Sequence, residues 1–86
     1  PPVRDVRPFV QAFIDHRRER EAQIIAQMEA GKTNIKDMVS VIYADVDKRL
    51  HPAACHSVLA HMIRLVQLGR VVSLDPPCVD SEYRLA

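Results

Sequence analysis

The densest group of charged side chains, His-Arg-Arg-Glu-Arg-Glu, occupies positions 16–21. On a helical wheel, His16 and Arg20 fall on the same side as the two preceding phenylalanines, with Arg17 and Glu21 at its edge. A fully solvated charged face would not share an apolar stripe. One interpretation is therefore that the phenylalanines pack on a neighbouring domain, where the cationic side chains bind carboxylates or carbonyls. The alternative is a solvated helix with local ion pairs such as Arg17–Glu21, each contributing about 0.3 kcal/mol.

A second chemical pattern is the pair His51 and Cys55, which are four residues apart and fall on one side of a helix. Imidazole and thiolate are good zinc ligands, but a zinc site needs a third and usually a fourth ligand. His56 points away from this pair, and the sequence does not place Cys78 near it. We therefore assign no metal ligands within these residues.

Ser57 and His61 have the spacing of a nucleophile and its base on one helix. The sequence offers them neither a carboxylate partner nor an oxyanion donor, so helix-surface and core-edge positions explain them better. The two glycines, Gly31 and Gly69, are too few and too far apart for a phosphate-binding loop. We therefore assign no catalytic residue and no cofactor to this chain.

The composition allows one small domain. The chain has 86 residues, of which 48% are hydrophobic and 27% charged, with a formal net charge of +1. These values exclude a disordered tail and a coiled coil, and no apolar run approaches the roughly 20 residues that span a bilayer. The two cysteines indicate reduced thiols in an intracellular protein. Because the chain starts at Pro1 without a Met, we expect it to be a piece of a larger protein.

Three helices and a hairpin should position these residues. Prolines mark residues 1–8 as an extended entry or interdomain linker, and the domain proper occupies 9–86. Apolar spacing predicts helices over 9–30 and 35–44, the second capped by Thr33 or Asn34. A third helix starts at Pro52, buries Ala54, Val58, Met62 and Leu65, and stops at Gly69. Strands are expected at 71–74 and 82–85. The fold class is mainly α with a small β-hairpin, a winged helix-turn-helix of three helices plus a wing.

Winged helices commonly place the third helix in the DNA major groove. Here the face opposite the core stripe carries His56, Ala60, Ile63, Arg64 and Gln67. One Arg and one Gln are few for reading base edges, and the wing adds no cation between Arg70 and Arg84. These features argue against duplex DNA as a partner, and a DNA-binding transcription regulator is the alternative. An outward Ile63 suits protein contact, so His56, Ile63 and Arg64 are secondary surface candidates. A protein-interaction module is the further alternative.

The order of several short motifs resembles the winged helix at the C-terminus of metallo-β-lactamase-fold hydrolases of the β-lactamase-like protein 2 type. The resemblance covers about residues 10–74. It is carried by His16-Arg17-x-x-Arg20-Glu21-x-Gln23-Ile24, Val41-x-Tyr43, Leu50-His51-Pro52-Ala53-Ala54, Leu59-x-His61-x-x-x-Leu65 and Gly69-x-Val71.

This resemblance implies a non-catalytic accessory domain. The zinc ions of such hydrolases belong to an upstream catalytic domain, whose His-x-His-x-Asp-His signature does not occur in these residues. Some members are described as endoribonucleases that act on single-stranded RNA in mitochondria, so a mitochondrial or cytoplasmic location is implied. The winged helix packs on the catalytic domain and shapes the entrance to its active site. By this resemblance His16, Arg17, Arg20 and Glu21 lie near the domain junction, where they contact the catalytic domain or the substrate.

Overall fold

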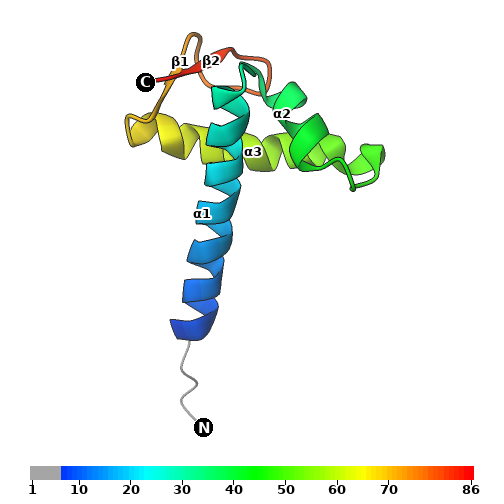
Figure 1. Cartoon of the computed structure of the whole chain (residues 1–86), viewed down its shortest axis with the longest axis vertical. Coiled ribbons are helices and arrows are strands. Elements are labelled where there is room, and N and C mark those ends of the chain that lie inside the picture. Colours follow the sequence, from blue (N-terminus) through cyan, green and yellow to red (C-terminus); the bar gives the residue numbers. More distant parts are fainter. Residues whose placement is uncertain (1–6) are drawn as a thin grey trace, which may run out of the picture.

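Three helices precede an antiparallel hairpin. The computed structural model describes the backbone of residues 7–86 and the side chains of residues 10–86. The elements are α1 (Arg7–Glu29), α2 (Ile35–Ile42), the short 3-10 helix η1 (Lys48–Leu50), α3 (His51–Gln67), β1 (Val71–Ser73) and β2 (Tyr83–Leu85). In Figure 1, α3 crosses the upper part of α1, and the hairpin lies above both. This order and pairing confirm the predicted winged helix-turn-helix.

Helix α1 starts two residues earlier than the sequence predicts, at Arg7 rather than Phe9. Pro8 therefore lies in the first helical turn, where its missing N–H costs no hydrogen bond. The expected extended entry is thus wrong for residues 7–8, and its remaining part, residues 1–6, lies outside the described residues. The helix ends at Glu29, one residue before the predicted end, and the predicted stop Gly31 follows with a φ of +101°, the left-handed conformation that glycine favours.

Side chains fix the start of α2 and the turn that joins α2 to α3. Asn34 Oδ1 accepts a hydrogen bond from the Asp37 amide at 2.9 Å, which makes Asn34 the cap of α2. Helix α2 ends at Ile42, two residues before the predicted Ala44, because Tyr43 leaves the helical conformation. His51 Nε2 lies 3.0 Å from the Tyr43 carbonyl oxygen and 3.1 Å from that of Val46, which ties the start of α3 to this turn.

The core gathers residues from all three helices and the hairpin. The predicted inner face of α3 is buried as expected, together with apolar residues of the other elements. The buried apolar residues are Ile24, Met28, Ile35, Met38, Val39, Ala54, Cys55, Val58, Met62, Leu65, Val71 and Tyr83. Tyr83 is fully buried and its hydroxyl donates to the Cys78 carbonyl oxygen at 2.7 Å. Because the Tyr83 ring is buried among residues of the three helices, it joins the wing to the helical core.

The wing is fixed to the turn that follows α1. Strands β1 and β2 pair antiparallel with Val72 opposite Arg84. An additional bridge pairs Asn34 with Glu82, and the Tyr83 amide donates to the Thr33 carbonyl oxygen at 2.8 Å. A two-stranded hairpin is marginal alone, so this third line of hydrogen bonds supports it.

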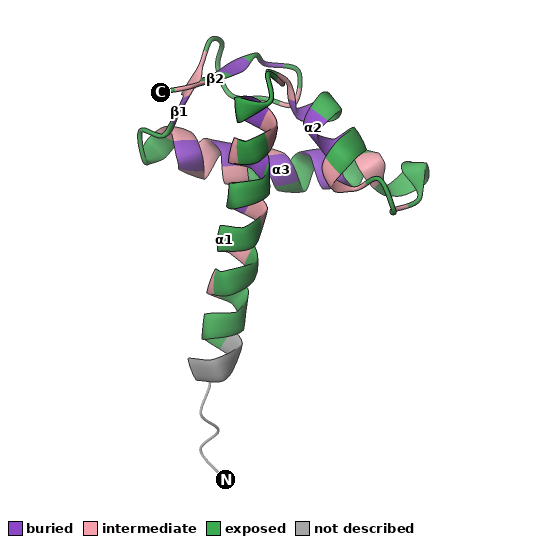
Figure 2. Ribbon diagram, viewed as in Figure 1, coloured by how far each residue is buried: buried purple, intermediate pink, exposed green. Residues whose placement is uncertain are grey.

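The N-terminal half of α1 extends away from the rest of the chain. We call residues 10–20 the α1 arm; none of them is buried, whereas Glu21, Ile24 and Met28 are. The apolar stripe of α1 is therefore not buried along the arm, where Phe13 is 70% and Val10 is 52% exposed. Figure 2 shows the arm as exposed or intermediate along its length. Periodicity identifies an apolar face, and nothing in the described part of the chain covers it.

Candidate functional site

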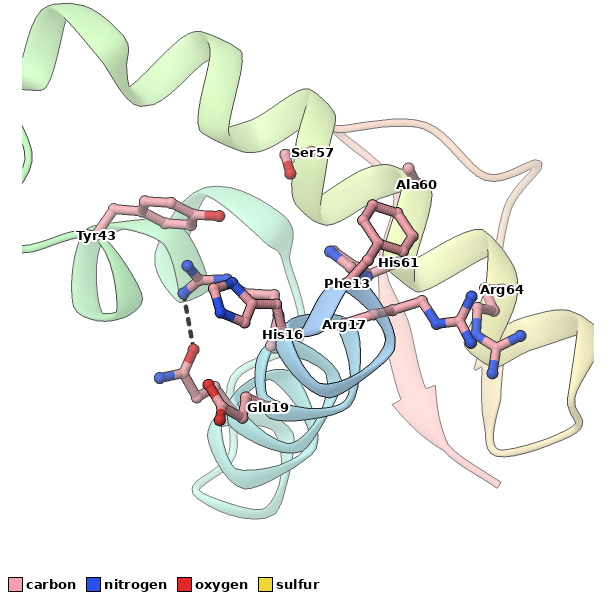
Figure 3. Close-up of a pocket in the computed structure, with 11 residues that line it drawn as sticks. Phe13, His16, Arg17, Glu19, Tyr43, Ser57, Ala60, His61 and Arg64 are labelled. Atoms are coloured by element: carbon pink, nitrogen blue, oxygen red, sulfur yellow. Dashed lines mark hydrogen bonds between the residues drawn. The ribbon is translucent and has the colours of Figure 1, made fainter. Parts of the chain in front are cut away.

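A cleft of about 620 Å³ opens where the α1 arm meets α3 and the end of α2. Its lining is rich in cationic and aromatic side chains from three separate elements. The lining residues, which Figure 3 draws as sticks, are Phe13, His16, Arg17, Glu19, Arg20, Gln23, Tyr43, Ser57, Ala60, His61 and Arg64. The sequence-predicted residues His16, Arg17 and Arg20 thus lie together.

Glu21, the fourth residue of the predicted group, is buried beneath this cleft. Its Oε2 lies 3.2 Å from His61 Nδ1 and 3.2 Å from Arg64 Nε, both on α3. A carboxylate only accepts, so the two nitrogens are the donors. The expected local pair Arg17–Glu21 is not formed among these contacts, since Glu21 faces α3. The three groups fix α1 against α3.

Arg64 occupies a different environment from the one predicted. The helical wheel placed it on the outward face of α3, but its pairing with Glu21 turns it toward α1, and its side chain is only 39% exposed. Ile63 is half-buried rather than outward. The helical-wheel prediction treated α3 as buried along a single stripe. In the structure α1 covers a second side of this helix. His56 is exposed, as expected.

Arg20 holds the end of α2 to α1. Its guanidinium carbon lies 4.4 Å from the centre of the Tyr43 ring, a cation–π distance. Its Nη1 donates to Gln23 Oε1 at 2.7 Å. Both partners lie within the resembling motifs, but neither was a predicted site residue. Gln23 lies about one helical turn after Arg20, and Tyr43 lies at the end of α2. The contact of Arg20 with Tyr43 became evident only once the register of α1 against α2 was known.

Arg17 lines the cleft and is half-buried, whereas its neighbour Arg18 is exposed and does not line the cleft. Its Nε is buried and has no hydrogen-bond partner within the described part of the chain. A buried donor without a partner carries a free-energy cost, which an anion bound in the cleft would remove. His16 also lines the cleft and is exposed.

Ser57 and His61 acquire a carboxylate neighbour that the sequence did not reveal. Glu21 is 40 residues from His61 along the chain, and its contact with Nδ1 resembles the orienting arm of a catalytic triad. No hydrogen bond joins Ser57 to His61 among the described residues, and Ser57 is exposed. His61 therefore serves the packing of α1 on α3 through Glu21.

The two side chains considered above as zinc ligands, His51 and Cys55, have structural roles in the fold. His51 points its Nε2 at two backbone carbonyls, which makes that nitrogen a donor rather than a ligand. Cys55 is buried, and burial raises the pKa of its thiol. In the part of the chain that is described, no group of three His, Cys, Asp or Glu side chains could hold a metal ion.

The exposed side of α3 offers little to a polyanion. All of α3 lies within the described residues, and its exposed positions are Pro52, Ala53, His56, Ser57, Ala60 and Gln67. None is Lys or Arg, so this face lacks the cations that phosphate contacts require. The neutral third helix predicted from the sequence is present in the structure.

Comparison with known families identifies the domain type. Residues 35–76, from the start of α2 to the loop after β1, match the family described as beta-lactamase associated winged helix domain. The chain belongs to this family. It is also 31% identical, over 65 residues, to the Beta-lactamase-like protein 2 homolog of Drosophila melanogaster. The match covers 72% of this chain and 22% of that protein, so this winged helix domain spans about a fifth of its relative's length. Within the described residues, no helix is long and apolar enough to cross a membrane.

Proposed function

We propose that this winged helix domain is the non-catalytic C-terminal accessory domain of a zinc-dependent metallo-β-lactamase-fold hydrolase. It packs on the upstream catalytic domain through the α1 arm and shapes access to the active site. The observation that carries the proposal is the exposed apolar face of that arm, in a domain whose family is named for its association with beta-lactamases.

The α1 arm has little packing support within the described residues, none of its own residues being buried. A helical segment of about this length is marginal in water, since helices in proteins owe most of their stability to packing. Phe13 is 70% exposed and Val10 is 52% exposed on the arm. Complete burial of such a side chain contributes about 1.5–3 kcal/mol. Docking on a second domain would supply this burial.

The catalytic machinery of the parent enzyme would lie outside this chain. Zinc would be held by the upstream domain, and the parent would act as an endoribonuclease on single-stranded RNA or hydrolyse an acyl substrate. RNA would meet the catalytic domain rather than α3, whose exposed side chains lack Lys and Arg. The parent enzyme would be intracellular, in the mitochondria or the cytoplasm.

The test uses the natural full-length protein. Bound zinc is measured by elemental analysis, and hydrolysis is assayed with single-stranded RNA and with an acyl thioester. We expect zinc and hydrolysis in the intact protein, and lower activity or solubility after deletion of residues 9–86. A metal-free, inactive full-length protein would contradict the proposal, as would full activity and solubility after the deletion.

A point substitution separates docking from folding. Phe13→Ser should lower the activity of the full-length enzyme because it removes apolar contact with the catalytic domain. Val41→Ser is the matched control, since Val41 is also exposed, at 46%, but lies on α2. Equal activities of the two variants would count against docking through the arm.

A further inference from the structure

The cleft beneath the α1 arm has an excess of positive charge. Three arginines line it against a single glutamate, Glu19. Arg20 is engaged by the Tyr43 ring and by Gln23. Arg64 gives its Nε to Glu21. The other guanidinium N–H groups that line the cleft are therefore available to an anion.

Arg17 and Arg64 are placed to share that anion. Both line the cleft, and Figure 3 draws their guanidinium groups at the same end of it. Each guanidinium has five N–H donors in a planar fork, and Arg64 spends only its Nε on Glu21. The buried Nε of Arg17 has no partner among the described residues. Two like charges at one end of a partly enclosed cleft repel each other unless a negative group lies between them.

The surroundings of this pair favour a protein carboxylate over a phosphodiester. Phe13 lies one helical turn before Arg17, lines the same cleft and is 70% exposed. An exposed aromatic ring beside paired arginines suits a polypeptide segment that presents an acidic side chain among apolar ones. A nucleic-acid backbone would require further cations along its path, and the exposed face of α3 has none.

We infer that the cleft binds one Asp or Glu side chain of the upstream catalytic domain, held between the guanidinium groups of Arg17 and Arg64. The carboxylate accepts hydrogen bonds from Arg17, whose Nε has no partner among the described residues, and from a terminal nitrogen of Arg64, and apolar residues beside it cover Phe13. This inference rests on the proposed function, because it names the partner group of the same docking surface.

Carbodiimide cross-linking of the full-length protein tests the inference. The substitution Arg17→Lys places a primary amine in the cleft, and a carbodiimide joins an amine to a carboxylate only when the two are in contact. Arg18→Lys is the matched control, since Arg18 lies on the same arm, is exposed and does not line the cleft. Peptide mass spectrometry identifies the residue that is joined, and circular dichroism checks that both variants fold.

We expect Arg17→Lys to form an amide with one Asp or Glu upstream of residue 1, and Arg18→Lys to form none with that residue. Absence of a cross-link, or one confined to residues 1–86, would overturn the inference. So would a cross-link that single-stranded RNA abolishes, together with loss of RNA binding in Arg17→Gln, because the cleft would then bind phosphodiesters.

Failure of this inference can be told from failure of the proposed function. If the full-length protein binds zinc, is hydrolytically active and loses activity in Phe13→Ser, the accessory-domain proposal stands whatever the cross-link shows. If it has neither metal nor activity, the accessory-domain proposal fails, and with it the assigned partner of Arg17.

Discussion

Replacement of Glu21 by glutamine probes the ion network that fixes α1 on α3. Glu21 is buried, and its carboxylate accepts from His61 Nδ1 and Arg64 Nε, each at 3.2 Å. Glutamine keeps the size of the side chain and a carbonyl oxygen for one of these donors. It removes the negative charge that both donors face, so the free energy of unfolding should fall.

The magnitude follows from the burial of each partner. A hydrogen bond to a charged group contributes about 1.5–3 kcal/mol. The Arg64 side chain is 39% exposed, so solvent screens its share. We therefore expect Glu21→Gln to lower the free energy of unfolding by about 1–2 kcal/mol. In a domain of this size, that corresponds to a melting temperature lower by about 5–15 °C.

Thermal and urea unfolding of the 86-residue chain, followed by circular dichroism, measures the effect. Glu19→Gln is the control because Glu19 lies on the same helix and lines the same cleft, but is exposed. It should change stability by less than about 0.5 kcal/mol. The reasoning is refuted if the two variants are equally stable, or if Glu21→Gln and Arg64→Gln are strictly additive in the double mutant, since groups in contact must couple.

Three further predictions concern the cap, the thiols and the wing. Asn34→Ala should cost about 1 kcal/mol in urea unfolding because it removes the cap of α2, and Thr33→Ala should cost less; equal losses would contradict the cap assignment. Exposed Cys78 should react with iodoacetamide long before Cys55, whose thiol is buried and has a raised pKa; mass spectrometry showing equal rates would contradict this. Burial raises the pKa of Tyr83 above its ordinary value near 10, so the unfolded chain loses the proton first and stability should fall as pH rises through the folded pKa; a pH series in which the Tyr83→Phe variant loses as much stability would refute it.

The helices and the core of α3 were predictable because their signals are local. Asn34 before an apolar repeat, Pro52 near a helix start and a glycine after each long helix act within one or two turns. The repeat that contains Val58 and Met62 has one face, and the structure buries that face. The two strands of the wing were expected from the turn residues between two short apolar runs, whereas their register, with Val72 opposite Arg84, came only from the structure.

The site was only partly predictable because its contacts span long sequence separations. The spacing within the arm brought Arg17 and Arg20 into one group, but it could not show that Glu21 turns to α3. The partner Arg64 is 43 residues away from Glu21. Helical periodicity predicted an apolar face on the arm, but it could not show whether another element of the chain covers Phe13.

Hydrogen–deuterium exchange of the α1 arm tests the docking claim most directly. Amides of residues 10–20 are compared between the natural full-length protein and the 86-residue chain, with the amides of α3 as internal reference. Docking predicts that the arm exchanges at least about tenfold more slowly in the full-length protein, equivalent to about 1.4 kcal/mol, while α3 is unchanged. Equal exchange of the arm in the two proteins would contradict the claim that α1 packs on a catalytic domain.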